Sequence, residues 1–471
     1  MKKFLLAISV CALLASIPVL ASCGHIHTLS DPTRENEVAP TCRKAGSYDE
    51  VIYCTECEAE LSRKKHEIAR TPHNFVDSVC TECGFEETES TEGLTFVANA
   101  GGESYSLQRI GSCINEEELV IGTYNGLPVT RILYGALEGC KNIKKITLHE
   151  TVQEIEPYAF RDCSSLEEIN LPDGIGIINY EVFKGCSSLK SITIPDSVYE
   201  ISDGAFRGCS TLSNVTIPEG LFKLGTNAFT ACDSFTSVTI PGNIAKIGDY
   251  AFSSCHALSE IIIDDGVAEI GAFSFFDCPE IKVVDLPFSI STIGNSAFLQ
   301  CTGIETVTMQ NNVSLIGPSA FSGCTSISSI VLSNSITQIQ TSAFSSCTSL
   351  TSIDLPSTLT SIGNNVFSSC TSLTSVTLPD NLALIGNATF MDCTALVSVT
   401  FGEKLISLGN ETFAGCESLA SVVFRNTSGW WYSEIPTASF GTKIPDNVFT
   451  SPTVTAMYMQ NNYLKMYLRK S

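Results

Sequence analysis

The chain has 471 residues, with 50 acidic against 27 basic side chains and a formal net charge of −23. A phosphate-binding surface needs Lys and Arg to release counterions, so this charge argues against nucleic acid as a partner. Only 16% of the residues are charged and large apolar residues recur throughout, which excludes disorder for most of the chain. At about 150 residues per domain the length predicts three units, unless an internal repeat sets the size.

The N-terminus has the pattern of an export signal. Two lysines precede the apolar stretch 4–20, which is short for a membrane span and is followed by small residues. The tetrad Leu20-Ala21-Ser22-Cys23 resembles the bacterial lipobox. This resemblance implies that residues 1–22 are a lipoprotein signal peptide and that diacylglycerol on the Cys23 sulfur anchors the mature protein. The alternative is an ordinary signal peptide with an incidental cysteine.

Residues 23–92 are rich in Cys and His and end in an acidic linker. Two C-x2-C pairs, Cys54 with Cys57 and Cys80 with Cys83, are separated by 22 residues. Two such turns present four thiolates and suit one structural Zn²⁺, so the spacing predicts a small zinc-ribbon-like module. Disulfides and free thiols are the alternatives. The alternative ligands for this metal are Cys42, His66 and His73.

No catalytic set accompanies this metal. The string nearest to a zincin helix is His66-Glu67-Ile68-Ala69-Arg70, in which Arg70 stands where the second histidine is needed. A site of four thiolates also leaves no coordination position for water. The sequence therefore predicts a protein that is not an enzyme and has no catalytic residues.

A repeat occupies the C-terminal two-thirds of the chain. Thirteen cysteines, each 23 residues from the next, share its phase: Cys140, Cys163, Cys186, Cys209, Cys232, Cys255, Cys278, Cys301, Cys324, Cys347, Cys370, Cys393 and Cys416. Phe stands three residues before all but the first of these cysteines, and apolar residues follow at the third, sixth and eighth positions, usually with Pro at the ninth. One unit has its apolar residues along a single edge, so only stacked units can bury a core.

This pattern predicts a repeat solenoid of about 13 rungs with short parallel strands on one face. Residues six and eight after each cysteine point inward and those five and seven after it point outward, by the period-two rule of strands. Pro at the ninth position ends the strand because it has no N–H to donate. Phe and Cys form the opposite wall, where we expect buried thiols that pack as small apolar groups rather than disulfides or a metal site.

The repeat resembles that of the BspA-like leucine-rich repeat family in period and residue type from Leu127 to Phe424. Residues 94–120 resemble the family's opening hairpin, and the break in phase after Phe424 begins a segment that resembles the closing module of some members. The resemblance implies a leucine-rich repeat solenoid at 129–424, an N-terminal cap at 93–128 and a C-terminal cap at 425–471. It also implies a surface-exposed binding or adhesion protein.

The outward side of the predicted strands is the candidate ligand-binding face. Ser and Thr predominate at the fifth and seventh positions and make a hydrogen-bonding surface with little charge. The alternative is that Ser and Thr simply suit an exposed strand. Neighbouring rungs that depart from this pattern mark the candidate site, which comprises Ile262, Val283 and Asp285 together with Thr239.

These features predict an exported protein, lipid-anchored to a bacterial cell envelope and surface-exposed, whose solenoid binds a protein or glycan. Adhesion to host matrix proteins or to other cells is the role that the family resemblance implies, and the lipid anchor is the predicted contact with the membrane. One alternative is a structural envelope spacer that presents the metal module. A metal-dependent enzyme is the other.

Overall fold

The computed structural model describes residues 30–40, 46–55, 58–68, 75–76, 79–80, 88–108, 115–435, 441–461 and 465–470. The chain forms two compact units, residues 1–87 and residues 88–471. Five residues that the sequence singles out lie outside the described ranges, namely Cys23, Cys42, Cys57, His73 and Cys83.

A three-stranded antiparallel sheet forms most of the described part of the first unit. Its strands are β1 (Thr33–Val38), β2 (Gly46–Tyr53) and β3 (Glu60–Ile68), in that order. A separate antiparallel pair consists of β4 (Phe75–Val76) and β5 (Val79–Cys80). Among the described side chains of this unit, only Val51 and Cys54 are both apolar and buried. Apolar packing therefore gives this sheet very little core.

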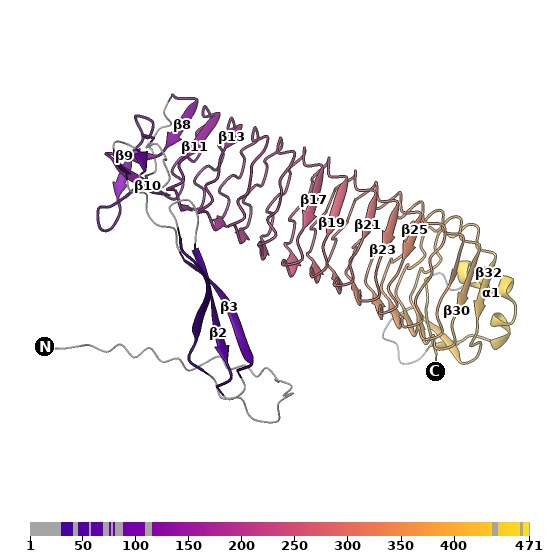
Figure 1. Ribbon diagram of the computed structural model, residues 1–471. Coiled ribbons are helices and arrows are strands. Elements are labelled where there is room, and N and C mark those ends of the chain that lie inside the picture. Colours follow the sequence, from indigo (N-terminus) through magenta and orange to yellow (C-terminus); the bar gives the residue numbers. More distant parts are fainter. Residues whose placement is uncertain are drawn as a thin grey trace. The chain divides into compact units, whose positions relative to one another are not determined.

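A parallel β-solenoid of about 14 turns with little helix forms the second unit (Figure 1). Neighbouring turns pair in parallel at the 23-residue offset, as Ser237 does with Glu260 and Val238 with Ile261. The solenoid that the sequence predicts is thus confirmed.

The first β-face holds the strands that follow the cysteines. In β21, for example, Val284 is buried between two exposed neighbours, so the predicted alternation of inward and outward side chains is observed. The strands of this face are β8 (Glu118–Ile121), β11 (Lys145–Leu148), β13 (Glu168–Ile169), β17 (Ser237–Ile240), β19 (Glu260–Ile263), β21 (Val283–Asp285), β23 (Thr306–Thr308), β25 (Ser329–Val331), β28 (Ser375–Thr377), β30 (Ser398–Phe401) and β32 (Ser421–Phe424).

The solenoid has a second β-face, whereas the sequence predicts strands on one face only. Most strands of this second face have two residues and bury one apolar side chain, as β22 buries Ile293. Segments this short carry no alternating pattern, which is why the prediction misses them. They are β10 (Leu127–Ile132), β12 (Glu154–Ile155), β14 (Ile177–Ile178), β15 (Glu200–Ile201), β16 (Lys223–Leu224), β18 (Lys246–Ile247), β20 (Glu269–Ile270), β22 (Thr292–Ile293), β24 (Leu315–Ile316), β26 (Gln338–Ile339), β27 (Ser361–Ile362), β29 (Leu384–Ile385) and β31 (Ser407–Leu408).

The segment from Ala to Cys closes each turn with two alternating kinds of hydrogen bond. The Phe298 N–H donates to the Ala320 carbonyl of the next turn at 2.8 Å, whereas the Cys301 N–H donates back to the Phe298 carbonyl at 3.2 Å. Two residues of this turn lie in the left-handed region, Ser296 with φ 54° and Gln300 with φ 64°. The chain therefore bends sharply at fixed points on either side of each Phe.

Phe side chains stack through the core from Phe160 to Phe413 and form a Phe ladder. Their ring centroids lie 5.1–5.9 Å apart with interplanar angles of 3–14°. Phe298 is fully buried, as the sequence predicts. Each ring between Phe160 and Phe413 packs on a ring from both neighbouring turns, so the ladder links consecutive turns.

An additional turn precedes the first repeated cysteine. Its strand β8 pairs with β11, and Glu118 lies opposite Lys145, at an offset of 27 residues rather than 23. Because this offset differs from the 23-residue period, the period of the cysteines predicts about 13 turns, one fewer than the structure has. Beside it, β6 (Phe96–Ala98) and β7 (Tyr105–Leu107) form an antiparallel hairpin, and both β7 and β9 (Thr123–Tyr124) pair with β10.

The C-terminal segment covers the last turn. β35 (Tyr467–Lys470) pairs antiparallel with β31, and β33 (Trp430–Ser433) and β34 (Thr442–Lys443) continue that sheet. The 3₁₀ turn η1 (Asp446–Phe449) leads to α1 (Pro452–Asn461), which packs against β32. Trp430 is fully buried against Phe424, so the end of the apolar core is covered. Among the helices of the described ranges, none has the length and apolar character needed to span a bilayer.

Candidate functional site

Two apolar side chains stand out on the outward side of the first β-face. Val283 on β21 is 55% exposed and Ile262 on β19 is 46% exposed, whereas Val284 is fully buried. The strand phase that the sequence predicts is therefore confirmed at these positions. Most outward positions on this face carry Ser or Thr, so exposed Ile262 and Val283, like Val331 on β25, which is also 55% exposed, depart from the pattern in a way that core packing does not explain.

A groove lies where the first β-face is interrupted. The consecutive strands β19 and β21 form no ladder with each other, although β17 pairs with β19 and β21 pairs with β23. The groove between them has a volume of about 500 Å³, and its lining includes Ile262, Asp285, Phe288 and Gln310. We call this site the central groove. It brings together two of the four residues that the sequence predicts for the binding face.

Hydrogen bonds join the turns that follow β19 and β21. The Gly266 N–H donates to Ser289 Oγ at 2.9 Å, and the Ser289 N–H donates to Asp265 Oδ1 at 3.0 Å. Ser289 Oγ in turn donates to the Val267 carbonyl at 2.7 Å. These bonds hold the turns together beside strands that do not pair, so the central groove is a built feature of the fold.

Phe288 lines the central groove and is missed by the prediction from sequence. Its side chain is 62% exposed. It stands ten residues after Cys278, at a position where every other turn has Asp, Glu, Asn, Ser or Gly. An aromatic residue at this otherwise polar or small position is the sequence signal that identifies it.

The central groove lies at one end of a stretch without basic residues. No Lys or Arg occurs between Lys282 and Lys404, and Asp285 is the charged side chain in the groove lining. An apolar surface with one negative charge suits a partner that offers apolar side chains beside a basic group.

The other two predicted residues share this face but lie outside the central groove. Thr239 is directly opposite Ile262 in the β17–β19 ladder and lines a separate groove of about 370 Å³. Val283 is exposed on β21, two residues before Asp285. The four predicted residues therefore lie on one face across three consecutive turns, and their role in binding stays a prediction.

Two of the four predicted zinc ligands lie among the described residues. Cys54 is buried directly after β2, and in the turn to β3 its N–H donates to the Ala59 carbonyl while its own carbonyl accepts from the Glu58 N–H. Cys80 is the last residue of β5. Within the described ranges no group of three or more His, Cys, Asp or Glu side chains is arranged to hold a metal. The zinc site therefore stays a prediction.

His66, the described alternative ligand, makes contacts within the sheet. It lies on β3 opposite Tyr48 of β2, and the two rings stack with centroids 5.0 Å apart. Its Nε2 lies 3.8 Å from Glu50 Oε2. The ring stack explains how His66 packs in the sheet, whereas its buried Nε2 has no hydrogen-bond partner among the described residues.

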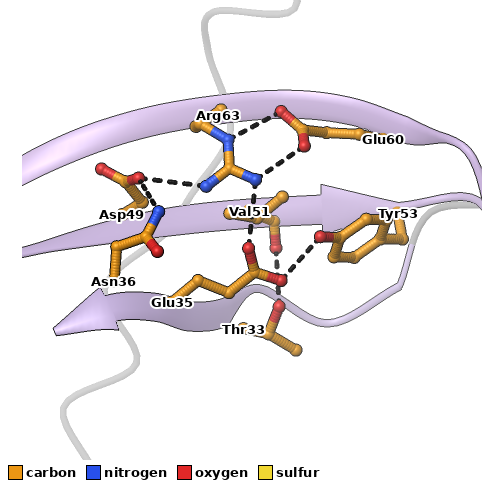
Figure 2. Close-up of polar contacts among 8 residues, drawn as sticks. All are labelled: Thr33, Glu35, Asn36, Asp49, Val51, Tyr53, Glu60 and Arg63. Atoms are coloured by element: carbon orange, nitrogen blue, oxygen red, sulfur yellow. Dashed lines mark hydrogen bonds and ion pairs between the residues drawn. The ribbon is translucent and has the colours of Figure 1, made fainter.

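An arginine cluster joins β1, β2 and β3 of the first unit (Figure 2). Arg63 lies 3.0 Å from both Asp49 and Glu35 and 2.7 Å from Glu60. Hydrogen bonds from Asn36 and Arg63 lower the pKa of Asp49, and the bond from Arg63 lowers the pKa of Glu60. Polar contacts thus link strands that share few apolar ones.

The repeated cysteines do not form a chemical site. From Cys163 to Cys416 each thiol is buried and donates to the carbonyl of the residue 26 positions earlier, at 2.8–3.3 Å. Burial raises the pKa of Cys347 to about 12, so its reactive thiolate is scarce at neutral pH. Cys140 differs from the expected buried thiol, because it is disulfide-bonded.

A known protein family matches the repeat region of the chain. The family described as "BspA type Leucine rich repeat region (6 copies)" matches residues 125–235, 223–350 and 314–444. No curated protein matches the chain.

Several solved structures are similar to this chain. A leucine-rich repeat protein from Bacteroides ovatus is 29% identical, with a TM-score of 0.59, over 70% of this chain and 93% of its own. A leucine rich cell surface protein from Faecalibacterium prausnitzii is 25% identical, with a TM-score of 0.43, over 72% of this chain and 96% of its own. The pneumococcal vaccine antigen PcpA is 16% identical, with a TM-score of 0.44, over 72% of this chain and 88% of its own. The first similarity supports the solenoid fold of the repeat region.

Proposed function

The chain belongs to the BspA-type leucine-rich repeat family, and we propose that it is a bacterial surface protein that binds another protein through the outward side of its first β-face. Stacked repeats offer the extended surfaces that binding proteins use. The observation that carries the proposal is the central groove, where Ile262 and Phe288 are exposed together on a face whose outward positions are mostly Ser and Thr.

Exposed apolar side chains beside a groove favour a protein partner. Covering Ile262 and Phe288 removes apolar area from water, which stabilises a complex by about 25 cal/mol per Å² before the opposing entropy is counted. A few such anchors dominate the energy of most protein interfaces. The space between β19 and β21 admits a side chain of the partner, and Asp285 supplies a polar contact that orients it.

We propose adhesion, to host matrix proteins or to other cells, as the biological role. A solenoid surface and a membrane anchor together suit a protein that works outside the cell. In this proposal Cys23 is the first residue of the mature chain and carries the lipid, because it follows Leu20-Ala21-Ser22 at the end of the apolar stretch. Several acyl chains hold a protein firmly at a membrane, whereas a single chain binds only marginally.

We also propose that one structural Zn²⁺ stabilises the first unit in a zinc-ribbon-like module, through Cys54, Cys57, Cys80 and Cys83. The two buried apolar side chains among the described residues of this unit are too few to hold the three-stranded sheet, and small units with little core need a metal or disulfides. Glu58, directly after Cys57, has a left-handed backbone with φ 57°. Its equivalent after Cys83 is a glycine, which adopts that conformation readily.

Binding of the mature chain to a panel of matrix proteins and to whole cells tests the proposed function. We expect at least one partner, and we expect Ile262→Glu with Phe288→Glu to weaken its binding about tenfold or more without lowering the melting temperature. Ile406→Glu is the matched control, because Ile406 is also exposed but lies beside β31 on the second β-face. Absence of any partner would favour an envelope spacer, and equal losses in the double variant and the control would contradict the assigned face.

A further inference from the structure

Two aromatic side chains are exposed on the second β-face, directly before β15 and β16. Tyr199 and Phe222 occupy the same position in consecutive turns, and their rings stack with centroids 5.5 Å apart and planes 3° from parallel. Tyr199 is 42% exposed and Phe222 is 56% exposed. The Tyr199 ring also covers Gly176 in the preceding turn, where a Cβ would lie 2.7 Å from Tyr199 Cε1. The stack is therefore closed on its N-terminal side.

On the other side the stack ends at Phe222. The next two turns have Ala245 and Ala268 at the equivalent position, so no ring continues the series. A groove of about 330 Å³ lies here, and its lining includes Phe222, Ala245, Gly225 and Gly248. Because Tyr199 occupies one face of the Phe222 ring, the free face is the one toward this groove. We call this site the aromatic groove.

The second β-face is interrupted at the same place. Where this face is continuous, the Ala268 N–H donates to the Ala245 carbonyl at 2.9 Å and the Gly271 N–H donates to the Ile247 carbonyl at 3.1 Å.

One turn earlier, the equivalent bonds would run from the Ala245 N–H to the Phe222 carbonyl and from the Gly248 N–H to the Leu224 carbonyl. Neither bond is formed in this described part of the chain, and β16 does not pair with β18. Leu224 and Gly248 are buried, whereas Phe222 and Ala245 are exposed, so the Ala245 N–H and the Phe222 carbonyl are the backbone groups open to a ligand.

The charges around the aromatic groove balance. Lys223 and Lys246 line it together with Asp203 and Asp249. Lys223 Nζ also lies 2.8 Å from Glu200, and Lys246 Nζ lies 3.2 Å from Asp249. In a chain with a net charge of −23, such a balanced lining favours a neutral ligand over a polycation or a polyanion.

We propose that the aromatic groove binds a neutral sugar residue of a glycan, which takes the next place in the ring stack after Phe222. The C–H face of a sugar ring is apolar and packs on an aromatic face. Its hydroxyl groups both donate and accept, so they can pair with the open N–H and carbonyl groups and with the charged side chains. A purely apolar ligand would leave those backbone groups unpaired. This site lies on the opposite β-face from the central groove and is independent of the proposed protein binding.

Titration of the mature chain with soluble polysaccharides tests the proposal. The neutral probes are amylose, laminarin, arabinoxylan and galactomannan, and the charged probes are chitosan and polygalacturonate. We expect at least one neutral probe to bind, and we expect Phe222→Ala to weaken that binding about tenfold or more. Ala245→Trp should do the same by filling the groove while leaving Phe222 in place.

Phe288→Ala is the matched control, because Phe288 is an exposed Phe in the central groove. We expect this variant to bind the neutral probe like the wild type, and we expect all three variants to melt like the wild type. Binding of charged probes alone, no binding at all, unchanged binding in both Phe222→Ala and Ala245→Trp, or an equal loss in Phe288→Ala would overturn the proposal. None of these results depends on whether a protein partner exists.

Discussion

The repeated thiols complete the hydrogen bonding of carbonyls inside the solenoid. The Phe298 carbonyl accepts from the Cys301 N–H at 3.2 Å and from the Cys324 thiol of the next turn at 3.1 Å. A buried carbonyl has two lone pairs to satisfy, and a thiol is small and apolar enough to sit beside a Phe ring while it donates. The cysteine period therefore reflects the joining of adjacent turns.

The thiols from Cys163 to Cys416 should resist alkylation in the folded protein. The thiolate is the nucleophile, and with the pKa of Cys347 near 12 the thiol form prevails at all pH values well below that. Iodoacetamide treatment at mildly alkaline pH, followed by mass spectrometry, should find these cysteines unmodified before denaturation and modified after it. Rapid alkylation of the native solenoid would show that the turns open readily.

Phe298→Ala should lower the free energy of unfolding by about 3–5 kcal/mol, because it leaves a cavity in a fully buried stack. Neighbouring turns are coupled, so the loss should spread along the solenoid. Urea unfolding measures the change, and hydrogen exchange shows which turns lose protection. Phe298→Leu is the control, since it keeps an apolar side chain and should lose less. A loss confined to one turn would contradict the coupling.

Individual strands show which parts of the fold can be predicted from the periodicity of the sequence. The inward and outward positions of the first β-face follow from alternation, as exposed Ile262 and buried Val284 illustrate. Once one side chain of a strand is known to point inward, the direction of the others in that strand follows. The second β-face has two-residue strands such as β22, in which no alternation exists to be detected. The grooves are also beyond prediction, because they depend on which neighbouring turns fail to pair. Phe288 and Phe222 become informative only when equivalent positions are compared across turns.

Replacing Thr239, Ile262 and Val283 together with Glu should leave the melting temperature unchanged and abolish partner binding. All three side chains point outward, so the charges stay in water while they obstruct the face. Val284→Glu is the matched control and should unfold the protein, because it places a charge in the core next to Val283. Collapse of the triple variant would contradict the assigned strand phase, and intact binding would exclude this face as the site.

The Arg63 cluster should make the first unit sensitive to acid. Asp49 and Glu60 have lowered pKa values in the folded state, so their stabilising effect is full above the usual carboxylate pKa of about 4 and is lost as the pH falls below it. Limited proteolysis of the whole chain by pepsin, from pH 5 down to pH 2, measures the loss. Arg63→Ala should make cleavage within 30–68 less dependent on pH, and an unchanged profile would contradict this origin.

At the scale of the whole molecule, the two units are stabilised in different ways. The solenoid has the Phe ladder and a covered C-terminal end, whereas the described sheet of the first unit has ion pairs and little apolar core. The repeat period identifies the solenoid at once, but it does not reveal the additional turn, because β8 and β11 pair at a different offset.

Chelation should therefore act on the first unit alone. We expect the purified mature chain to contain one equivalent of zinc, and a chelator to abolish protection of residues 46–68 from hydrogen exchange while the solenoid melts as before. Cys54→Ser should lose the metal, whereas Cys347→Ser should retain it. Absence of metal with full protection, or a disulfide that includes Cys54 or Cys80, would contradict the zinc site.

Trypsin cleaves only after Lys or Arg. Since neither residue occurs between Lys282 and Lys404, the five turns around Cys301, Cys324, Cys347, Cys370 and Cys393 contain no bond that this protease can cut, whether they are folded or not. Tryptic digestion of a cell surface that carries this protein should thus leave residues 283–404 as one large fragment, because every site that this protease can cut lies before or after that stretch.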